Sequence, residues 1–558
     1  GLHISLLGMG LYRLLRKRLH TRYVTAALAT TVFLISYAVL SGNGVSTQRA
    51  VGMCLIYLFA DVTGYAYDML NALGIVVLVL LWENPFLLSY SGFVFSVMAV
   101  IAIGVGANVL LEWEHSWKRR QQAGEETIKK TFFSRQKEGI LVSFAIQLFT
   151  IPLVAYSYYE IPVYAMLINL FVLAVVNGLL GLTVLGVIVG MAFLPAGRVL
   201  FAPCGWMLDS YRFLCEVSLK IPGAQRITGK PAHMRIFWYY LGLGVFLLAI
   251  YACARRNEKH KDCRETADLC VSRRKKRLQG IVFSCFIAFL LLFLLFPQKK
   301  SFEIDFLDVG QGDGIYLCTG GGTSMFIDGG STDVKQVGKY RILPFLKAKG
   351  VSEISYWFVS HTDTDHVSGL KEVLVSGYRV EYLVFAKAVE KEAKTKELAE
   401  LARSHGTKVF YMQAGDTVRS KRAAMRCLYP KAADKAEDVN DLCLVLQFEE
   451  GDISALFGGD ISTDVEEQLS RREKWDKVLI FKADHHGSRY ANAEALLKCI
   501  RPEITVASAG KDNRYGHPSP DAVQRIKESG SRFFCTIEGG RIRVRVIENK
   551  LVCETYVK

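Results

Sequence analysis

The stretch His361-Thr362-Asp363-Thr364-Asp365-His366 places two imidazoles and two carboxylates within six residues, directly after the apolar run from Ile354 to Val359. The apolar run is typical of a buried strand, so these side chains would lie at its carboxyl end. Imidazole and carboxylate together suit zinc, manganese or iron, and groups at a strand end can point into one cleft. An acidic turn with two solvated histidines would have the same sequence, but the segments that follow favour a metal centre.

Four other apolar runs are followed within a few residues by Asp or His, and glycines nearby allow the chain to turn tightly. They are Ser324 to Ile327 before Asp328, Ile453 to Phe457 before Asp460, Val478 to Phe481 before His485 and His486, and Thr505 to Ser508 before His517. Strands that end in such groups would bring them together along one edge of a sheet sandwich. The repeated pattern predicts a metal site built from several strand ends.

The order of these motifs resembles the metallo-β-lactamase superfamily: Asp-Gly-Gly at 328–330, His-x-Asp-x-Asp-His at 361–366, Gly-Asp at 459–460 and His-His-Gly-Ser at 485–488. Phe-Leu-Asp-Val-Gly-Gln-Gly-Asp at 306–313 and Tyr-Gly-His-Pro at 515–518 are similar to its DNA-uptake branch, the ComEC competence proteins. The resemblance implies an αββα metallo-β-lactamase-like domain over residues 301–558, with two β-sheets sandwiched between helices.

Carried over by position, the resemblance implies six metal ligands, with Asp460 bridging two ions. These are His361, Asp363, Asp365, His366, Asp460 and His485. Two departures affect the first ion, because the superfamily usually has His where Asp363 stands, and residues 438–443 offer Asn and Asp where a further His ligand is expected. A site rich in carboxylate is harder, so the expected cofactor is a divalent metal, zinc or manganese, as one or two ions.

Such a centre supports hydrolysis, because a divalent ion lowers the pKa of bound water and neutralises charge on a phosphoryl or acyl oxygen. Asp365, His517 and His486 are the candidate catalytic residues. His517, restrained by Pro518, is the first candidate to protonate the leaving oxygen or hold a phosphate, and His486 is the second. A turn histidine bonded to a neighbour is the alternative for His517. Asp328 is expected to support a turn or a ligand.

Residues 1–300 contain most of the apolar runs, and their length argues for a bilayer rather than a protein core. We expect a polytopic α-helical membrane domain over residues 1–300, a channel domain with about nine transmembrane helices. The spans are expected near residues 23–40, 50–63, 69–82, 86–111, 139–157, 162–177, 179–194, 233–253 and 279–296. The polar stretch 199–219 is expected to form an interfacial or re-entrant helix.

Three clusters of Lys and Arg, at 13–22, 118–137 and 273–277, set the orientation of these spans. By the positive-inside rule all three are cytoplasmic, and an even number of spans between successive clusters agrees with this. The last span then leads outward. The hydrolase domain is therefore expected outside the cytoplasmic membrane.

The membrane half also resembles the ComEC channel domain. Gly-Leu-His-Ile-Ser at 1–5, Gln-Arg-Ala at 48–50, Asn-Ala-Leu-Gly at 71–74 and Asn-Pro-Phe-Leu at 84–87 are similar to its signatures, so the resemblance spans nearly the whole chain. The family commonly has an oligonucleotide-binding-fold domain and further helices before this point. The chain is therefore expected to be part of a longer protein.

Charge is distributed unequally between the halves. Residues 1–300 hold 31 Lys and Arg against 15 Asp and Glu, out of 68 and 53 in the whole chain, which leaves 37 against 38 for residues 301–558. The net charge of +15 thus lies in the loops of the membrane half. A near-neutral hydrolase domain holds nucleic acid only loosely by electrostatics, so strand capture is expected from the channel, a preceding domain or a partner.

The resemblance implies a bacterial DNA-uptake channel for natural transformation, in which single-stranded DNA crosses the membrane while the outer domain degrades the strand that is not imported. The implied partners are DNA, the lipid bilayer, and the DNA-receptor and cytoplasmic motor proteins of the competence machinery. Two other functions stay open. One is a membrane-anchored phosphodiesterase acting on a small or cell-wall phosphoester, and the other is a transporter whose soluble domain only binds or braces.

Overall fold

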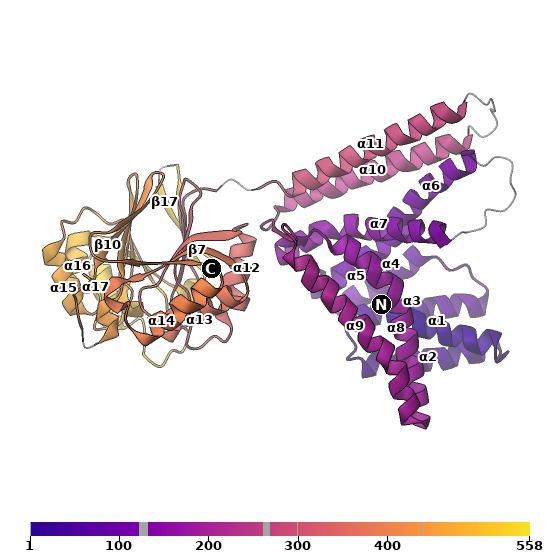
Figure 1. The fold of residues 1–558 in the computed structure, drawn as a ribbon, viewed down its shortest axis with the longest axis horizontal. Helices are drawn as coiled ribbons and strands as arrows, with labels where there is room; N and C mark the ends of the chain where they lie inside the picture. Colours follow the sequence, from indigo (N-terminus) through magenta and orange to yellow (C-terminus); the bar gives the residue numbers. More distant parts are fainter. Residues whose placement is uncertain are drawn as a thin grey trace. The chain divides into compact units, whose positions relative to one another are not determined.

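The computed structural model describes residues 2–121, 132–259, 268–297, 300–436, 438–548 and 550–557. The chain divides into two compact units, Gly1–Phe296 and Pro297–Lys558. The first consists of helices and one small two-stranded sheet, and the second contains two large sheets (Figure 1). Lys129 and Lys130 of the second basic cluster lie outside the described residues.

The apolar runs of the first unit form helices. Their bounds are α1 Leu2–Lys17, α2 Tyr23–Leu40, α3 Val45–Thr63, α4 Met69–Glu83, η1 Pro85–Ser89, α5 Ser91–Ile101, η2 Ala102–Ala107, α6 Asn108–Gln121, α7 Phe132–Tyr158, α8 Ala165–Ala192, α9 Leu194–Lys220, α10 His233–Lys259 and α11 Asp268–Leu294. The small sheet pairs β1 Glu160–Pro162 with β2 Gln225–Ile227.

Five helices among the described residues are long and apolar enough to cross a bilayer. They include Tyr23–Leu40, Ser91–Ser116, Lys137–Tyr158, His233–Arg256 and Arg274–Leu294. Large apolar side chains of this unit face outward, with Trp82 92% and Leu40 85% exposed. Because water disfavours such exposure and lipid does not, the first unit is a membrane domain. The expected number of about nine spans stays a prediction.

The structure differs from the expected spans 162–177 and 179–194, because one helix, α8 Ala165–Ala192, runs through most of both. Gly178 lies between the two expected spans, and a helical Gly costs only about 1 kcal/mol relative to Ala. Breaking a helix inside a bilayer would leave backbone groups unbonded at several kcal/mol each, so the helix continues. The stretch 199–219 lies within α9.

The second unit contains an eight-stranded sheet in the order β17-β16-β3-β4-β5-β6-β7-β8 and a seven-stranded sheet in the order β15-β14-β13-β12-β11-β10-β9. The strands are β3 Glu303–Phe306, β4 Gly314–Cys318, β5 Ser324–Asp328, β6 Glu353–Phe358, β7 Arg379–Ala386, β8 Lys408–Met412, β9 Thr417–Ser420, β10 Ala423–Tyr429, β11 Val445–Glu450, β12 Ile453–Phe457, β13 Ile480–Lys482, β14 Ile504–Ala507, β15 Arg532–Cys535, β16 Ile542–Ile547 and β17 Lys550–Thr555.

Helices cover the outer face of each sheet (Figure 1). They are α12 Leu343–Ala348, α13 Thr364–Val375 and α14 Ala393–Ser404 on the larger sheet, and α15 Thr463–Arg472, α16 Glu494–Ile500 and α17 Pro520–Glu528 on the smaller one. Short turns complete the unit: η3 Gly338–Ile342, η4 Lys387–Val389, η5 Val439–Leu442, η6 Asp484–Gly487 and α18 Thr536–Gly539.

Three apolar clusters hold these four layers together. The first lies between the sheets and includes Ile327 of β5 and Phe448 of β11. The second joins the larger sheet to its helices through residues such as Leu370 of α13, and the third joins the smaller sheet to residues such as Leu497 of α16. The central strands β4 and β5 are buried on both faces, as expected in a sheet covered on both sides. This arrangement confirms the predicted αββα metallo-β-lactamase-like fold.

Parallel pairing brings the predicted motifs to one edge of each sheet. Strands β5 to β8 are parallel neighbours, and so are β12 to β15. The carboxyl ends of parallel strands meet at the same edge, and loops there commonly carry function. The loops after β5, β6, β12, β13 and β14 are those that contain the Asp and His motifs.

We predict that Trp357→Phe destabilises the second unit by about 1–3 kcal/mol, because the buried carbonyl of Asp328 loses its partner. Trp357 is fully buried, stacks on Phe326 at 4.3 Å between ring centroids and donates its indole N–H to that carbonyl at 2.6 Å. Pulse proteolysis in urea, followed with a carboxyl-terminal tag, measures the change. Trp475→Phe, which removes a longer indole bond of 3.2 Å at a partly exposed site, is the control. Equal losses in the two variants would contradict the prediction.

Candidate metal centre

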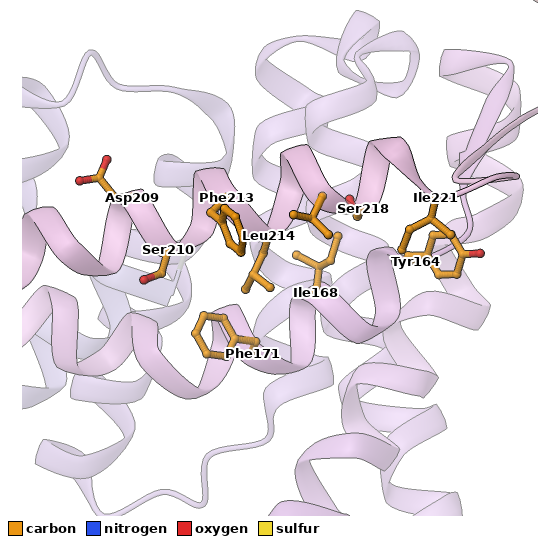
Figure 2. Close-up of a pocket in the computed structure, with 10 residues that line it drawn as sticks. Tyr164, Ile168, Phe171, Asp209, Ser210, Phe213, Leu214, Ser218 and Ile221 are labelled. Carbon is orange, nitrogen blue, oxygen red and sulfur yellow. The ribbon is translucent and has the colours of Figure 1, made fainter.

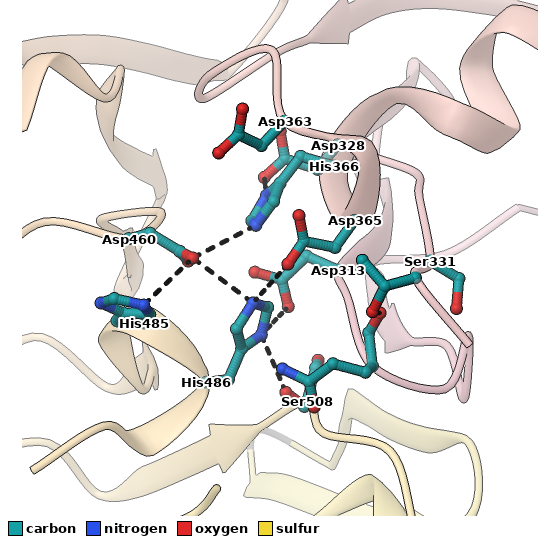
Figure 3. Close-up of polar contacts among 12 residues, drawn as sticks. Asp313, Asp328, Ser331, Asp363, Asp365, His366, Asp460, His485, His486 and Ser508 are labelled. Atoms are coloured by element: carbon teal, nitrogen blue, oxygen red, sulfur yellow. Dashed lines mark hydrogen bonds and ion pairs between the residues drawn. The ribbon is translucent and has the colours of Figure 1, made fainter. Parts of the chain in front are cut away.

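Four buried side chains from distant parts of the second unit converge in one place (Figure 3). They are Asp313, which precedes β4, His366 in the first turn of α13, Asp460 after β12 and His486 in η6. Each offers one possible ligand atom, and these atoms all lie within 4.8 Å of one another. Two imidazoles and two carboxylates form a donor set that suits zinc, manganese or iron.

The two imidazoles are oriented by bonds on their far side. His366 Nδ1 lies 3.0 Å from Asp328 Oδ2, and His486 Nδ1 lies 3.0 Å from the carbonyl oxygen of Ser508. A carboxylate and a carbonyl can only accept, so each Nδ1 carries a proton, and in the neutral ring each Nε2 presents a lone pair to the centre. Hydrogen bonds of this kind fix the ring of a metal-binding histidine.

Several atoms of the cluster lack hydrogen bonds, although the Nε2 atoms of both histidines lie 3.4 Å from Asp460 Oδ2. His366 Nε2, His486 Nε2, Asp313 Oδ1 and Asp460 Oδ1 are buried without a hydrogen bond in the described part of the chain. A buried acceptor without a partner is costly, unless a bound cation satisfies it. These four atoms therefore fit a divalent ion.

The electric field of the site favours positive charge at the same place. Burial lowers the pKa of His366 and His486, but the carboxylate of Asp460, assisted by Asp328 and Asp313 respectively, raises each well above its ordinary value. Burial likewise raises the pKa of Asp460, yet His486 and His366 hold it well below its usual range. A site that attracts protons so strongly attracts a metal cation for the same reason.

The backbone at the centre is held in a conformation that side chains rarely adopt. His485 and His486 have φ values of 49° and 54°, and Asp328 has a φ of 59°. Such residues cost about 1–3 kcal/mol each and cluster at functional sites. Asp328 is fixed by Ser360, which donates its N–H and its hydroxyl to the Asp328 carboxylate, both at 2.8 Å. Asp328 thus holds the ring of His366, and its support of a metal ligand stays a prediction.

The other predicted ligands lie around the cluster at different distances. Asp365 Oδ2 lies 3.6 Å from His486 Nε2, and His485 Nε2 lies 3.8 Å from Asp460 Oδ2. His361 is buried, with Nε2 4.0 Å from Asp363 Oδ2 and Nδ1 beside Ser360. Their assignment as ligands stays a prediction.

Asp363 has a different environment, because its side chain is 46% exposed and pairs with the ammonium of Lys394 at 2.9 Å. This carboxylate stands where the superfamily usually has a histidine. An exposed carboxylate that already has a cationic partner is a weaker ligand than a buried one. Its role at a first ion stays a prediction.

His517 lies beside the cluster, with its ring centroid 5.6 Å from that of His485 and 6.2 Å from that of His486. Burial, followed by repulsion from His486 and His485, lowers its pKa to about 4, so the ring is neutral at pH 7. Asn513 holds the loop by bonds to the backbone N–H and carbonyl of His517. The catalytic role of His517 stays a prediction.

Sequence reasoning missed Asp313 as a member of the cluster, and it also missed Lys482. Lys482 is 1% exposed, and its ammonium lies 2.8 Å from Asp313 Oδ2. Burial lowers the pKa of Lys482, but Asp313 and then Asp460 more than offset this, so it remains charged. The available signal for Asp313 was the Gly-Gln-Gly-Asp motif, which had been used only for the resemblance.

The membrane unit offers a second cavity, a groove of about 680 Å³ between α8 and α9 (Figure 2). Its lining is apolar except at Asp209, Ser210, Ser218 and the hydroxyl of Tyr164. A nucleic-acid site needs cations to meet phosphates, and the described residues of the lining include none. The groove therefore does not have the character of a strand-binding site.

Known proteins are similar to this chain over both of its units. Residues 1–252 match the family model described as Competence protein. ComE operon protein 3 of Bacillus subtilis (strain 168) is 25% identical over 98% of this chain and 67% of its own length. Recombination protein 2 of Haemophilus influenzae is 24% identical over 99% of this chain and 68% of its own length. The chain thus spans about two thirds of these relatives, and the predicted resemblance to ComEC-type competence proteins is confirmed.

Among solved structures, the metallo-beta-lactamase fold protein YhfI from Bacillus subtilis is similar over 44% of this chain and 100% of its own length. The identity is 11% and the TM-score 0.32. The fold assignment rests on the two sheets and their helices described above. The chain is therefore similar to competence proteins, with long apolar helices in its first unit and a metallo-β-lactamase-like fold in its second.

We predict that His366→Ala lowers divalent-metal affinity of the full-length protein by more than about 100-fold, because it removes a buried ligand rather than an outer partner. Asp363→Ala should change the affinity much less, since that carboxylate is exposed and paired with Lys394. Competition with a chelator, read by metal analysis, measures both. An equal loss of metal affinity in both variants would contradict this prediction, because Asp363 would then bind the metal as strongly as His366.

We further predict that Asp328→Asn lowers the affinity by about 10- to 100-fold, the range found for outer partners of metal-binding histidines. The reason is that an amide holds the proton of His366 Nδ1 less well than a carboxylate does. Asp308→Asn, which changes a half-exposed carboxylate paired with Arg341, is the matched control. An unchanged affinity in Asp328→Asn would contradict this support role.

Proposed function

We propose that this ComEC-type competence protein passes single-stranded DNA across the cytoplasmic membrane, and that its second unit is a metal-dependent nuclease that degrades the strand not imported. One observation carries the enzymatic half. Asp313, His366, Asp460 and His486 lie together, and each has a buried atom without a hydrogen bond in the described chain. This donor set supports a divalent-ion site, with zinc or manganese as the proposed metals.

A divalent ion held by these four residues would supply water of lowered pKa and neutralise charge on a phosphoryl oxygen. The protein orients this chemistry through fixed groups: Asp328 and the Ser508 carbonyl hold the two imidazoles. Lys482 holds Asp313 by an ion pair that water cannot reach. Fixed dipoles and charges in a dry site need no rearrangement during reaction.

His517 suits the binding of phosphate better than the delivery of a proton. A pKa of about 4 leaves few rings protonated at neutral pH, whereas the N–H of the neutral ring can donate to a phosphoryl oxygen at any pH above this value. His486 is assigned to the ion rather than to proton transfer, because its Nε2 faces Asp460 at 3.4 Å. Asp365, 19% exposed beside His486, is the carboxylate that can receive a proton from water at the mouth of the site.

The uptake half rests on the competence relatives and on the membrane unit. The positive-inside rule supports an outward position for the second unit, in contact with the strand before it enters. DNA-receptor and cytoplasmic motor proteins are the proposed partners, since the sequence has no phosphate-binding loop of its own to drive transport. A domain that only braces the channel would not need buried acceptors without partners, which argues against that alternative.

We predict that the full-length protein in detergent cleaves DNA only when loaded with a divalent metal. Asp460→Ala should lower the rate by at least about 100-fold, as expected for the loss of an electrostatic group at the reacting centre. The exposed Asp464→Ala on α15 should retain activity and serves as the control. A metal-loaded protein that is inert on single- and double-stranded DNA but hydrolyses a small phosphodiester would support the phosphodiesterase instead.

A further inference from the structure

A row of rings leads from the metal centre to the surface. The rings of His486 and His517 are stacked at 6.2 Å with an interplanar angle of 28°, and those of His517 and Tyr515 at 5.8 Å and 27°. The guanidinium of Arg514 lies 5.3 Å from the centroid of Tyr515. The row thus begins at the buried His486 and continues through the half-buried His517 and the exposed Tyr515 to the cation of Arg514.

The loop that carries this row is fixed at both ends. The side chain of Asn513 donates to the carbonyls of Gly510 and His517 at 2.9 and 2.6 Å, and it accepts from the His517 N–H at 2.9 Å. Gly510 N–H donates to the side chain of Gln311, next to the loop that contains Asp313. Because the loop is held by the same elements as the metal cluster, Tyr515 has a defined position relative to it.

Tyr515 is 53% exposed although it is a large aromatic residue in a well-held loop. Its ring contacts are His517 and Arg514, so one part of the ring is supported and the rest faces solvent. Exposed aromatic rings beside a cation are the elements with which proteins bind unpaired nucleobases and their phosphates. The near balance of 37 basic and 38 acidic residues in 301–558 makes such a contact necessary, since bulk charge gives little attraction.

We propose that Tyr515 is a base-stacking residue that selects unpaired nucleotides for the metal centre, and that Arg514 contacts the adjoining phosphate. Within a duplex the faces of the bases are covered by their neighbours, so the platform binds single strands and frayed ends. His517 then lies between the stacked base and the metal ligands, where the next phosphate would lie. This inference rests on the proposed nuclease function and names the form of nucleic acid that the site accepts.

The test uses full-length protein in detergent, a single-stranded oligonucleotide and the same oligonucleotide with abasic positions. Tyr515→Ala should raise KM for the normal strand on the order of tenfold, the size of a lost aromatic–base stack, with little change in kcat. Tyr515→Phe should keep the wild-type KM, because the ring rather than the hydroxyl makes the contact. The wild type should lose affinity for the abasic strand, and Tyr515→Ala should not distinguish the two strands.

Tyr490→Ala is the control, since Tyr490 is 71% exposed in the same unit but belongs to no ring contact of this row. Fluorescence anisotropy of the same strands repeats the comparison without turnover, so the inference is tested even if no cleavage occurs. The wild type could cleave DNA while Tyr515→Ala keeps the wild-type KM and still distinguishes the abasic strand. This result would overturn the stacking role but not the nuclease function. Absence of both DNA cleavage and DNA binding in the wild type would overturn the proposed function itself.

Discussion

The carboxylate of Asp460 lies against three imidazoles in a place that solvent barely reaches. Its Oδ2 is 3.4 Å from His366 Nε2, 3.4 Å from His486 Nε2 and 3.8 Å from His485 Nε2. Polar groups this close in a buried site are stable only if the rings are protonated or a cation is bound between them. The parallel strands and the left-handed turns after them hold these groups together. The geometry of the site therefore depends directly on the fold.

A second layer of groups makes the arrangement rigid. Asp328 and the carbonyl of Ser508 each accept a hydrogen bond from the far nitrogen of an imidazole, and Lys482 forms an ion pair with Asp313. Because these partners are buried, their bonds are electrostatically strong and few alternatives compete with them. The result is a preformed centre whose open side is bordered by the better exposed His485 and by the 510–518 loop.

The resemblance implied the sandwich, and the apolar runs placed His366, Asp460 and His486 after strands. His366 and Asp460 were expected as ligands, whereas His486 was expected to transfer a proton. Asp313 was not predicted, because it precedes β4 instead of following a strand. The antiparallel pairing of β4 with β5 places Gly314 opposite Asp328, so the start of one strand lies beside the end of the other. Lys482 was missed because a lysine is read as exposed until its buried partner is known. Likewise, pattern alone could not tell that α8 continues through Gly178.

X-ray absorption at the metal edge tests the central claim most directly, which is that the buried cluster of the full-length protein binds a divalent ion. The account predicts a bound ion that resists buffer exchange and shows scattering from two imidazole rings together with oxygen ligands, as the donor set of the cluster requires. A spectrum with oxygen ligands alone would place the ion on exposed carboxylates. Such a result, or no retained ion at all, would contradict the account.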